Sequence, residues 1–133
     1  MTVQKAYEIA LSLNDTTTKQ DDSYEPHILN WTNMFLQECL DNENCVREYH
    51  HDKILGFAPE LTSFDDVVPY HDGIVTALPY WLASQIMKSD RDNVWSSRYY
   101  DMYLNRVNSK TPVIPGAIDV WGRDKDAKSI ARY

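Results

Sequence analysis

The side chains best suited to metal binding or acid–base catalysis form two short histidine clusters. His50 and His51 are followed by Asp52, and His71 is followed by Asp72. Adjacent side chains diverge on both helices and strands, so His50 and His51 cannot easily share one ion. The sequence also lacks the HxH and HxxxH spacings, whereas histidine ligands need convergent partners. We therefore expect histidines in solvated loops and no metal site.

Pairs of aspartates are the second candidates, because two carboxylates can share acid–base work or hold Mg²⁺. The pairs are Asp21 with Asp22, Asp65 with Asp66, and Asp90 with Asp92. Each pair falls in a predicted loop or just before a predicted helix, where Asp is favoured for turns and caps. We interpret these residues as turn and cap residues.

Familiar catalytic and nucleotide-binding motifs do not occur in the sequence. The four glycines form no GxSxG, GxxxxGK[ST] or GxGxxG motif. The two cysteines, Cys39 and Cys45, lack the CxxC spacing of a zinc ribbon or a redox pair. We expect ordinary thiols in a reducing cytoplasm, no catalytic residue, no cofactor, and a protein that is not an enzyme.

Charge is unevenly distributed along the 133 residues. The net charge is −7; from Lys110 onward five Lys or Arg stand against three Asp, which gives +2 and leaves −9 for residues 1–109. The acidic residues 1–109 repel phosphates, which argues against a protein that binds nucleic acid through its phosphate groups. The sequence shows no export signal, and no apolar stretch approaches the ~20 residues of a membrane span, so we expect a soluble, unexported protein.

Four segments have apolar residues at helical spacing. They predict a mainly α fold, a small bundle of about four helices, which must position the candidate residues described above. We place the helices at residues 3–13, from 26 to about 44, from 72 to a turn at 89–92, and from there to about 109. Thr2 and Asp72 are predicted to cap the first and third helices.

Prolines and glycines mark the interruptions between and within these helices. Pro79 falls inside the third predicted helix, where it removes a backbone donor, so we expect a kink between Val75 and Pro79. Residues 45–69 lose the helical pattern and predict a long irregular loop that could contain a short β-hairpin. Residues 14–23 contain no apolar side chain and predict a surface loop.

Aromatic residues are unusually frequent, with nine Tyr and four Trp. Those on predicted helix faces are expected in the core: Trp31, Trp81, Trp95 and Tyr99.

The chain ends in a segment unlike the rest. We divide it into a helical domain, 1–109, and an extended C-terminal arm, 110–133, because residues 111–122 include two prolines and two glycines. An irregular arm cannot bury its own apolar side chains, so they need another surface. The predicted partner-binding residues are Ile114, Ile118, Val120, Trp121, Arg123, Lys125, Lys128, Arg132 and Tyr133.

Two stretches resemble a pattern in the head-to-tail connectors, or adaptors, of tailed bacteriophages. Residues 61–72 are LTSFDDVVPYHD and residues 77–83 are ALPYWLA; the family commonly shows LxSxDDxxP before a helix with ALPYGLA. The residues that carry the resemblance are Asp65, Asp66, Pro69, Leu78, Pro79, Tyr80 and Trp81. It extends loosely from about residue 24 to 122. Trp81 replaces the usual Gly, so the packing beside this helix must be filled differently.

The resemblance implies a structural virion protein at the junction of capsid and tail, assembled in the host cytoplasm. Such proteins form a homo-oligomeric ring, typically of twelve copies, below the portal protein. DNA passes through the ring without sequence-specific binding, and a stopper or tail-completion protein attaches below. An acidic lumen would let phosphates slide past, and the basic arm would face an acidic protein surface.

Two other functions stay open at this point. The acidic body suggests an inhibitor that mimics DNA and binds a host nuclease. The densest group of titratable residues suggests a small metal-dependent hydrolase: Asp65, Asp66, His71 and Asp72.

Overall fold

The computed structural model describes residues 1–14 and 24–112, and residues 15–23 and 113–133 lie outside the described part. The described part is mainly helical, which confirms the mainly α character predicted from the sequence. Its helices are α1 (Val3–Leu13), α2 (Glu25–Glu38), α3 (Leu40–Tyr49), α4 (Asp72–Val75), α5 (Leu78–Ser89) and α6 (Asn93–Lys110). Within these ranges no helix is long and apolar enough to cross a membrane.

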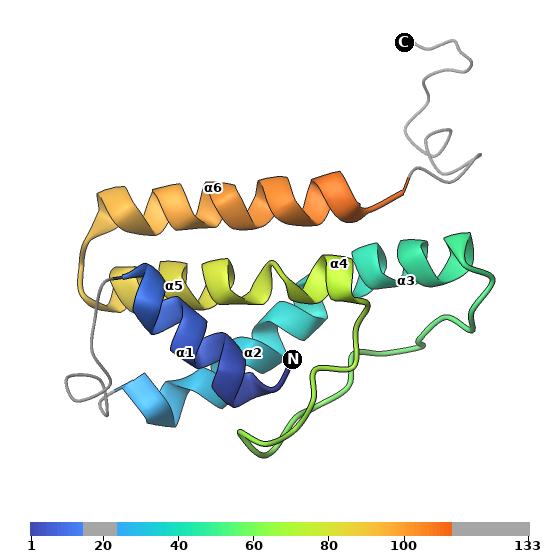
Figure 1. Ribbon diagram of the computed structural model, residues 1–133, viewed down its shortest axis with the longest axis horizontal. Helices are drawn as coiled ribbons and strands as arrows, with labels where there is room; N and C mark the ends of the chain where they lie inside the picture. The colour runs from blue at the N-terminus through green and yellow to red at the C-terminus, as the bar shows by residue number, and fades with distance from the viewer. Residues whose placement is uncertain (15–23, 113–133) are drawn as a thin grey trace, which may run out of the picture.

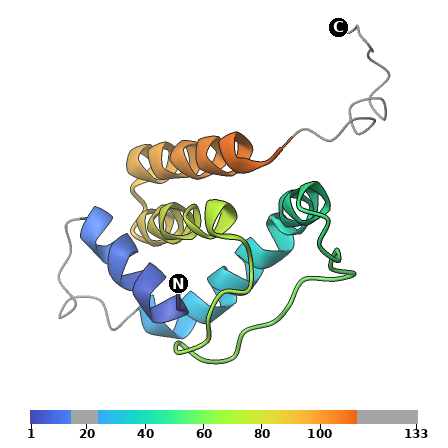
Figure 2. The same cartoon turned by 45° about the vertical axis from the view of Figure 1, so that its right-hand side comes forward.

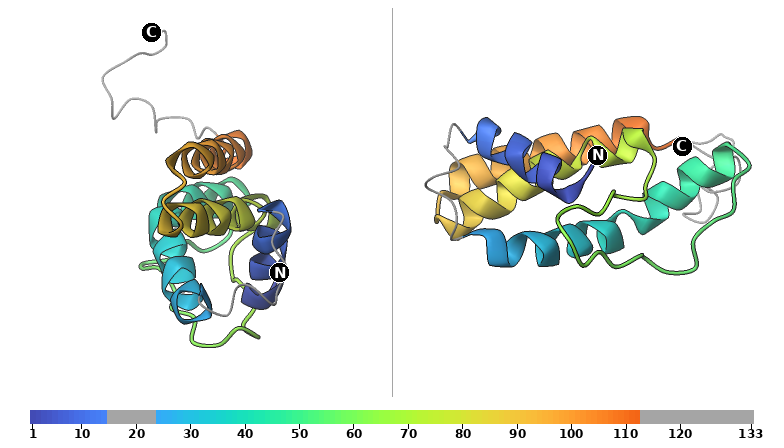
Figure 3. Two further views of the ribbon diagram at one scale, coloured as in Figure 1. Left: turned by 90° about the vertical axis from the view of Figure 1, so that its left-hand side faces the viewer. Right: turned by 60° about the horizontal axis from the view of Figure 1, so that its bottom comes forward.

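Helix α5 lies at the centre of the molecule. It packs against α6 on one side and against α1 and α2 on the other (Figures 1 and 2). The end view in Figure 3 shows α1 and α2 on two sides beneath α5. Burial follows this arrangement, because α5 is apolar on more than one face and Leu78, Trp81, Leu82 and Ile86 are all buried. Each such side chain contributes about 1.5–3 kcal/mol by leaving water.

Pro79 begins a helix and does not kink one. The single helix predicted from residue 72 is two helices, since α4 ends at Val75 and α5 starts at Leu78 with Pro79 in its first turn. A first-turn residue needs no N–H, so proline costs little there. The predicted cap at Asp72 is also wrong, because His71 occupies the cap position without a side-chain hydrogen bond. Thr2 does cap α1 and accepts from the Lys5 N–H at 3.1 Å.

Cys39 divides the second predicted helix into α2 and α3. Its N–H donates to the Phe35 carbonyl at 2.9 Å, and its own carbonyl accepts from the Glu43 N–H at 2.8 Å. The change of direction lets Phe35 stay in the core while Glu43 and Val46 are buried on the next helix. An apolar stripe does not distinguish one long helix from two that meet at a buried residue.

Two asparagines hold the segment from 50 to 71, here called the crossing segment. The Asn33 amide donates to the Leu61 carbonyl at 3.0 Å and accepts from its N–H at 2.8 Å. Asn44 pairs in the same way with Leu55, at 2.9 and 2.8 Å. The described part of this segment contains no strand, only an isolated bridge of Val67 with Thr2. Hydrogen bonds from side-chain amides therefore hold this segment in place of the backbone pairing of the β-hairpin that the sequence allowed.

Candidate functional site

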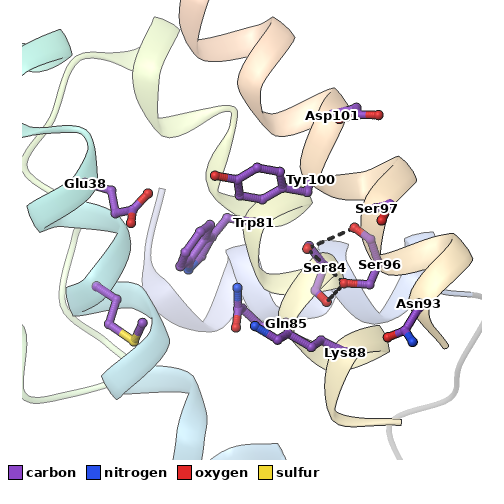
Figure 4. Close-up of a pocket in the computed structure, with 11 residues that line it drawn as sticks. Glu38, Trp81, Ser84, Gln85, Lys88, Asn93, Ser96, Ser97, Tyr100 and Asp101 are labelled. Carbon is purple, nitrogen blue, oxygen red and sulfur yellow. Dashed lines mark hydrogen bonds between the residues drawn. The ribbon is translucent and has the colours of Figure 1, made fainter. Parts of the chain in front are cut away.

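A groove of about 610 Å³ lies between α2, α5 and α6 (Figure 4). Its walls come from three helices that are separate in the sequence but adjacent in the fold. It is open to solvent, with side chains from α2 and α6 on its two sides and α5 beneath. The lining residues are Met34, Glu38, Trp81, Ser84, Gln85, Lys88, Asn93, Ser96, Ser97, Tyr100 and Asp101.

Trp81 forms the apolar floor of the groove. It is 3% exposed, and its indole N–H donates to the Trp31 carbonyl at 2.8 Å. Its ring centroid lies 5.2 Å from that of Tyr103 and 6.3 Å from that of Tyr100. Met34 and Tyr100 are more exposed, at 42% and 37%. Trp81 thus fills the space beside α5 where the connector pattern has glycine.

Charged and amide side chains at the groove have no partner in the described part of the chain. Glu38, Gln85, Lys88 and Asp101 make no hydrogen bond or ion pair within residues 1–14 and 24–112. Figure 4 shows Gln85 beside Trp81, and Glu38 facing Trp81 from α2. Polar groups of this kind can bind a partner without first breaking an internal contact.

Two serines close the groove where α5 meets α6. The Ser84 hydroxyl donates to the Ser96 carbonyl at 3.0 Å, and the Ser96 hydroxyl donates to the Ser84 carbonyl at 3.0 Å (Figure 4). A serine nucleophile needs a general base within hydrogen-bond reach, but these hydroxyls are already used to join two helices. The groove is suited to binding a chain, with an apolar floor and a polar rim.

The histidine cluster is organised around Glu43, which is fully buried. Glu43 accepts from Arg47 Nε at 2.7 Å, from the His71 backbone N–H at 2.9 Å, and lies 2.8 Å from His71 Nδ1. His71 Nε2 lies 3.4 Å from Asp52, and the His50 ring stacks on His71 with centroids 5.6 Å apart. These contacts fasten the start of α4 to α3.

The prediction that the histidines lie in solvated loops is therefore only partly correct. His50 and His51 are exposed and follow α3, but His71 is two-thirds buried against a carboxylate. Within the described residues no group of three or more His, Cys, Asp or Glu could hold a metal ion. Glu43 was missed because acids are seldom fully buried; the available signal was Arg47 four residues later.

One aspartate of each described pair serves a turn or a cap through its side chain. The Asp66 carboxylate accepts from the Thr62 and Ser63 N–H groups, both at 3.0 Å. Asp92 caps α6 by accepting from the Trp95 N–H at 3.1 Å, and Asp90 accepts from the Tyr24 hydroxyl. The pair of Asp21 and Asp22 lies outside the described residues.

The residues of the proposed hydrolase site are not joined to one another. In the described part, no hydrogen bond or ion pair connects Asp65 or Asp66 with His71 or Asp72. Asp66 holds the turn in the crossing segment, and His71 binds Glu43.

The thiols are not activated. Burial raises the pKa of Cys39 to about 11, against a smaller opposite effect of its hydrogen bond with Tyr103. Its Sγ lies 3.3 Å from the Tyr103 hydroxyl, and burial also raises the pKa of that phenol. The pKa of Cys45 is likewise raised, mainly by desolvation. Neither thiol is a ready nucleophile at neutral pH.

The residues of the connector pattern make separate contacts within the fold. Leu78, Pro79 and Trp81 are buried at the start of α5, and the Arg106 guanidinium lies 5.2 Å from the ring centroid of Tyr80. The Pro69 carbonyl accepts from Arg47 at 3.2 Å. These contacts support the fold, and Trp81 also lines the groove.

Large apolar side chains are exposed on several elements, and α6 and the crossing segment carry most of them. On α6, Val94, Trp95 and Met102 are 62%, 44% and 44% exposed, with the Arg98 guanidinium 5.0 Å from the Trp95 ring centroid; we call these four residues the α6 stripe. The core position predicted for Trp95 is therefore wrong, and Trp31 is only partly buried. In the crossing segment, Ile54, Phe57 and Val67 are 54%, 81% and 63% exposed.

The predicted partner-binding residues all lie outside the described part of the chain. They are Ile114, Ile118, Val120, Trp121, Arg123, Lys125, Lys128, Arg132 and Tyr133.

Comparison with known proteins identifies no relative. No family model, no curated protein and no solved structure matches the chain. The resemblance to connectors thus stays a prediction from residues 61–83.

Proposed function

We propose that this protein is a head-to-tail connector that assembles as a ring below a phage portal protein. The observation that carries the proposal is the exposure of large apolar side chains on two opposite sides of one small fold. A ring of identical subunits needs two different contact surfaces on each copy, because each copy touches its neighbours head to tail. Exposed apolar groups that share a face mark such contacts, and the other residues of the α6 stripe lie three or four positions from Arg98 on one helix.

The two surfaces are the α6 stripe and the crossing segment. Figures 1 and 2 show α6 on one side of α5 and the crossing segment on the other. Asn33 and Asn44 fix the crossing segment by four hydrogen bonds of 2.8–3.0 Å, so Phe57 is presented from an ordered backbone. In the proposed ring, the α6 stripe of one copy contacts the crossing segment of the next.

The charge distribution is consistent with a channel for DNA. Residues 1–109 carry −9, and a lumen lined by carboxylates repels phosphates and lets the duplex slide. The portal protein would bind one end of the ring and a stopper or tail-completion protein the other. No residue has a catalytic role in this proposal.

The other two functions gain no specific support from the structure. A hydrolase would use Asp66 and His71, whose side chains are already engaged in separate structural contacts. A DNA mimic needs carboxylates in rows on one face, yet Glu43 is buried and Asp92 caps a helix.

Mass measurement of the purified protein, with and without a portal protein from the same genome, tests the proposal. We expect a closed ring alone or on the portal. Met102→Asp on the α6 stripe and Phe57→Asp on the crossing segment should each prevent ring closure, since each removes one contact surface. Asn108→Asp on α6, outside the α6 stripe, and Gln37→Asp on α2 are controls at exposed positions that lie on neither surface.

Mixing the two defective variants makes the test sharper. Each retains one intact surface, so a head-to-tail contact predicts a heterodimer that cannot grow further. A monomer that ignores the portal, or rings that survive both substitutions, would overturn the proposal.

A further inference from the structure

We propose that the groove over Trp81 binds residues 113–133, the part of the C-terminal arm that follows the described chain, of a second copy of this chain. The inference rests on the proposed function, because a neighbour in the ring supplies the arm. It deepens that function by naming the surface that receives the arm. The site is the groove of about 610 Å³ between α2, α5 and α6.

The apolar part of the groove suits the apolar part of the arm. Met34 and Tyr100 are each more than a third exposed beside the Trp81 ring. The arm contains Ile118 and Trp121 within a short stretch. Such side chains supply the anchors that a groove of this size can desolvate.

The charged part of the groove suits the charged part of the arm. Two acids, Glu38 on α2 and Asp101 on α6, outnumber the one base, Lys88 on α5, and none of them has a partner in the described chain. Basic residues such as Arg123 and Lys125 directly follow the apolar stretch of the arm. Residues 1–109 carry −9 and residues 113–133 carry +1, from four Lys or Arg against three Asp, which favours encounter between copies.

The exit of the chain from α6 favours a second copy as the source of the arm. The groove uses the first half of α6, from Asn93 to Asp101, whereas the described chain leaves α6 after Lys110. There the Thr111 hydroxyl accepts from the Asn42 amide at 3.0 Å, which fixes the exit beside α3. A copy's own arm would have to reverse direction after this anchor, and a neighbour's arm need not.

Cysteine cross-linking of the full chain tests this arrangement. Cys45→Ser removes the more accessible native thiol, and Cys39 is buried. One preparation then carries Ser97→Cys at the groove, where the change is small and the hydroxyl has no partner in the described chain. The other carries Ala117→Cys in the arm, which leaves Ile118 and Trp121 in place. Any disulfide between the two preparations joins two copies.

A strong disulfide dimer in the mixture is the expected result. The yield should exceed, by about tenfold or more, that of a control mixture in which Ser12→Cys on α1 replaces the groove cysteine, because docking raises the effective concentration. Ser12 is exposed and does not line the groove. A chain with both Ser97→Cys and Ala117→Cys shows whether the arm instead closes on its own copy.

Cross-linking and mass measurement together distinguish failure of the docked arm from failure of the connector function. Cross-linking between copies supports the docked arm, even where mass measurement finds no ring and the connector function fails. A ring without cross-linking overturns the docked arm and leaves the connector standing. Cross-linking only within the doubly substituted chain means that a copy binds its own arm, and overturns the inference. No cross-link and no ring overturns both.

Discussion

His71 Nδ1 lies 2.8 Å from a carboxylate oxygen of Glu43, and Glu43 has no exposed surface. The same carboxylate accepts from Arg47 Nε at 2.7 Å and from the His71 N–H at 2.9 Å. A single acid on α3 thereby fixes both the end of the crossing segment and the start of α4. This contact is structural, and it explains why a histidine beside an acidic loop need not be catalytic.

Glu43→Ala should lower the free energy of unfolding by about 2–4 kcal/mol, because it leaves the Arg47 and His71 donors without their partner. The partial exposure of both partners, at 22% and 32% of their side chains, keeps the cost below that of a fully buried pair. Glu48→Ala, an exposed position on the same helix, is the control and should change stability by less than about 0.5 kcal/mol. Urea unfolding measures both; equal effects would contradict the structural role of Glu43.

Asp66→Ala should destabilise the protein by about 1–2 kcal/mol, since the carboxylate binds two backbone N–H groups in the crossing segment. Its neighbour is a matched control: Asp65→Ala removes a side chain that makes no hydrogen bond in the described chain. The Asp65 variant should unfold within about 0.5 kcal/mol of the natural protein. If instead Asp65→Ala abolished binding of a divalent ion, the hydrolase interpretation would regain support.

Trp81→Ala should cost about 3–5 kcal/mol, because the residue fills the space between α2, α5 and α6 and is 3% exposed. Trp81→Phe keeps an aromatic ring but leaves the Trp31 carbonyl, now at 2.8 Å from the indole nitrogen, without its donor. It should cost about half as much or less. Trp95→Phe, at an exposed position on α6, serves as the control with little effect. Thermal unfolding ranks the three, and an order with Trp95→Phe as the worst would contradict this packing.

The sequence was a good guide to the helices and a poor guide to their junctions. Spacing of apolar residues predicts α1 and α6 closely, with the caps at Thr2 and Asp92 in place. The junctions at Cys39 and before Leu78 were missed because periodicity continues across them, and only tertiary packing decides where a helix bends or stops. The core position predicted for Trp95 was wrong because an apolar residue on a helix does not by itself show which face of that helix packs against other elements.

The candidate site was harder to predict than the fold. The groove joins Glu38, Trp81 and Tyr100 from three helices. The spacing of residues within one helix does not predict which residues of other helices will lie beside it. Glu43 was missed because its three donors include a backbone N–H 28 residues away. The turn at Asp66 and the cap at Asp92 were predicted better, since turns and caps depend on neighbours in the sequence.

Stability should fall as the pH rises from about 9 to 11, in part through Cys39. Burial raises the pKa of this thiol from 9.0 to about 11, so the folded protein favours the neutral form. The stabilisation is complete below pH 9 and is lost as the pH rises through the folded pKa, by at most about 1.4 kcal/mol per pH unit. Cys39→Ser does not titrate in this range, so its unfolding free energy should fall less steeply. Urea unfolding at pH 8, 9, 10 and 11 compares the slopes, and parallel curves would show that the thiol does not contribute.

Removal of residues 113–133 should leave the helices intact and abolish assembly. The cut follows Pro112 because the Thr111 hydroxyl joins Val107 and Asn42, at 2.7 and 3.0 Å, and an earlier cut would lose both contacts. Core side chains such as Leu82 and Tyr103 are buried by helices that the truncation retains. Circular dichroism measures the helix content, and mass measurement, with and without the portal protein, measures assembly. Unfolding would show that the arm completes the core, whereas an intact ring would place every subunit contact on α6 and the crossing segment.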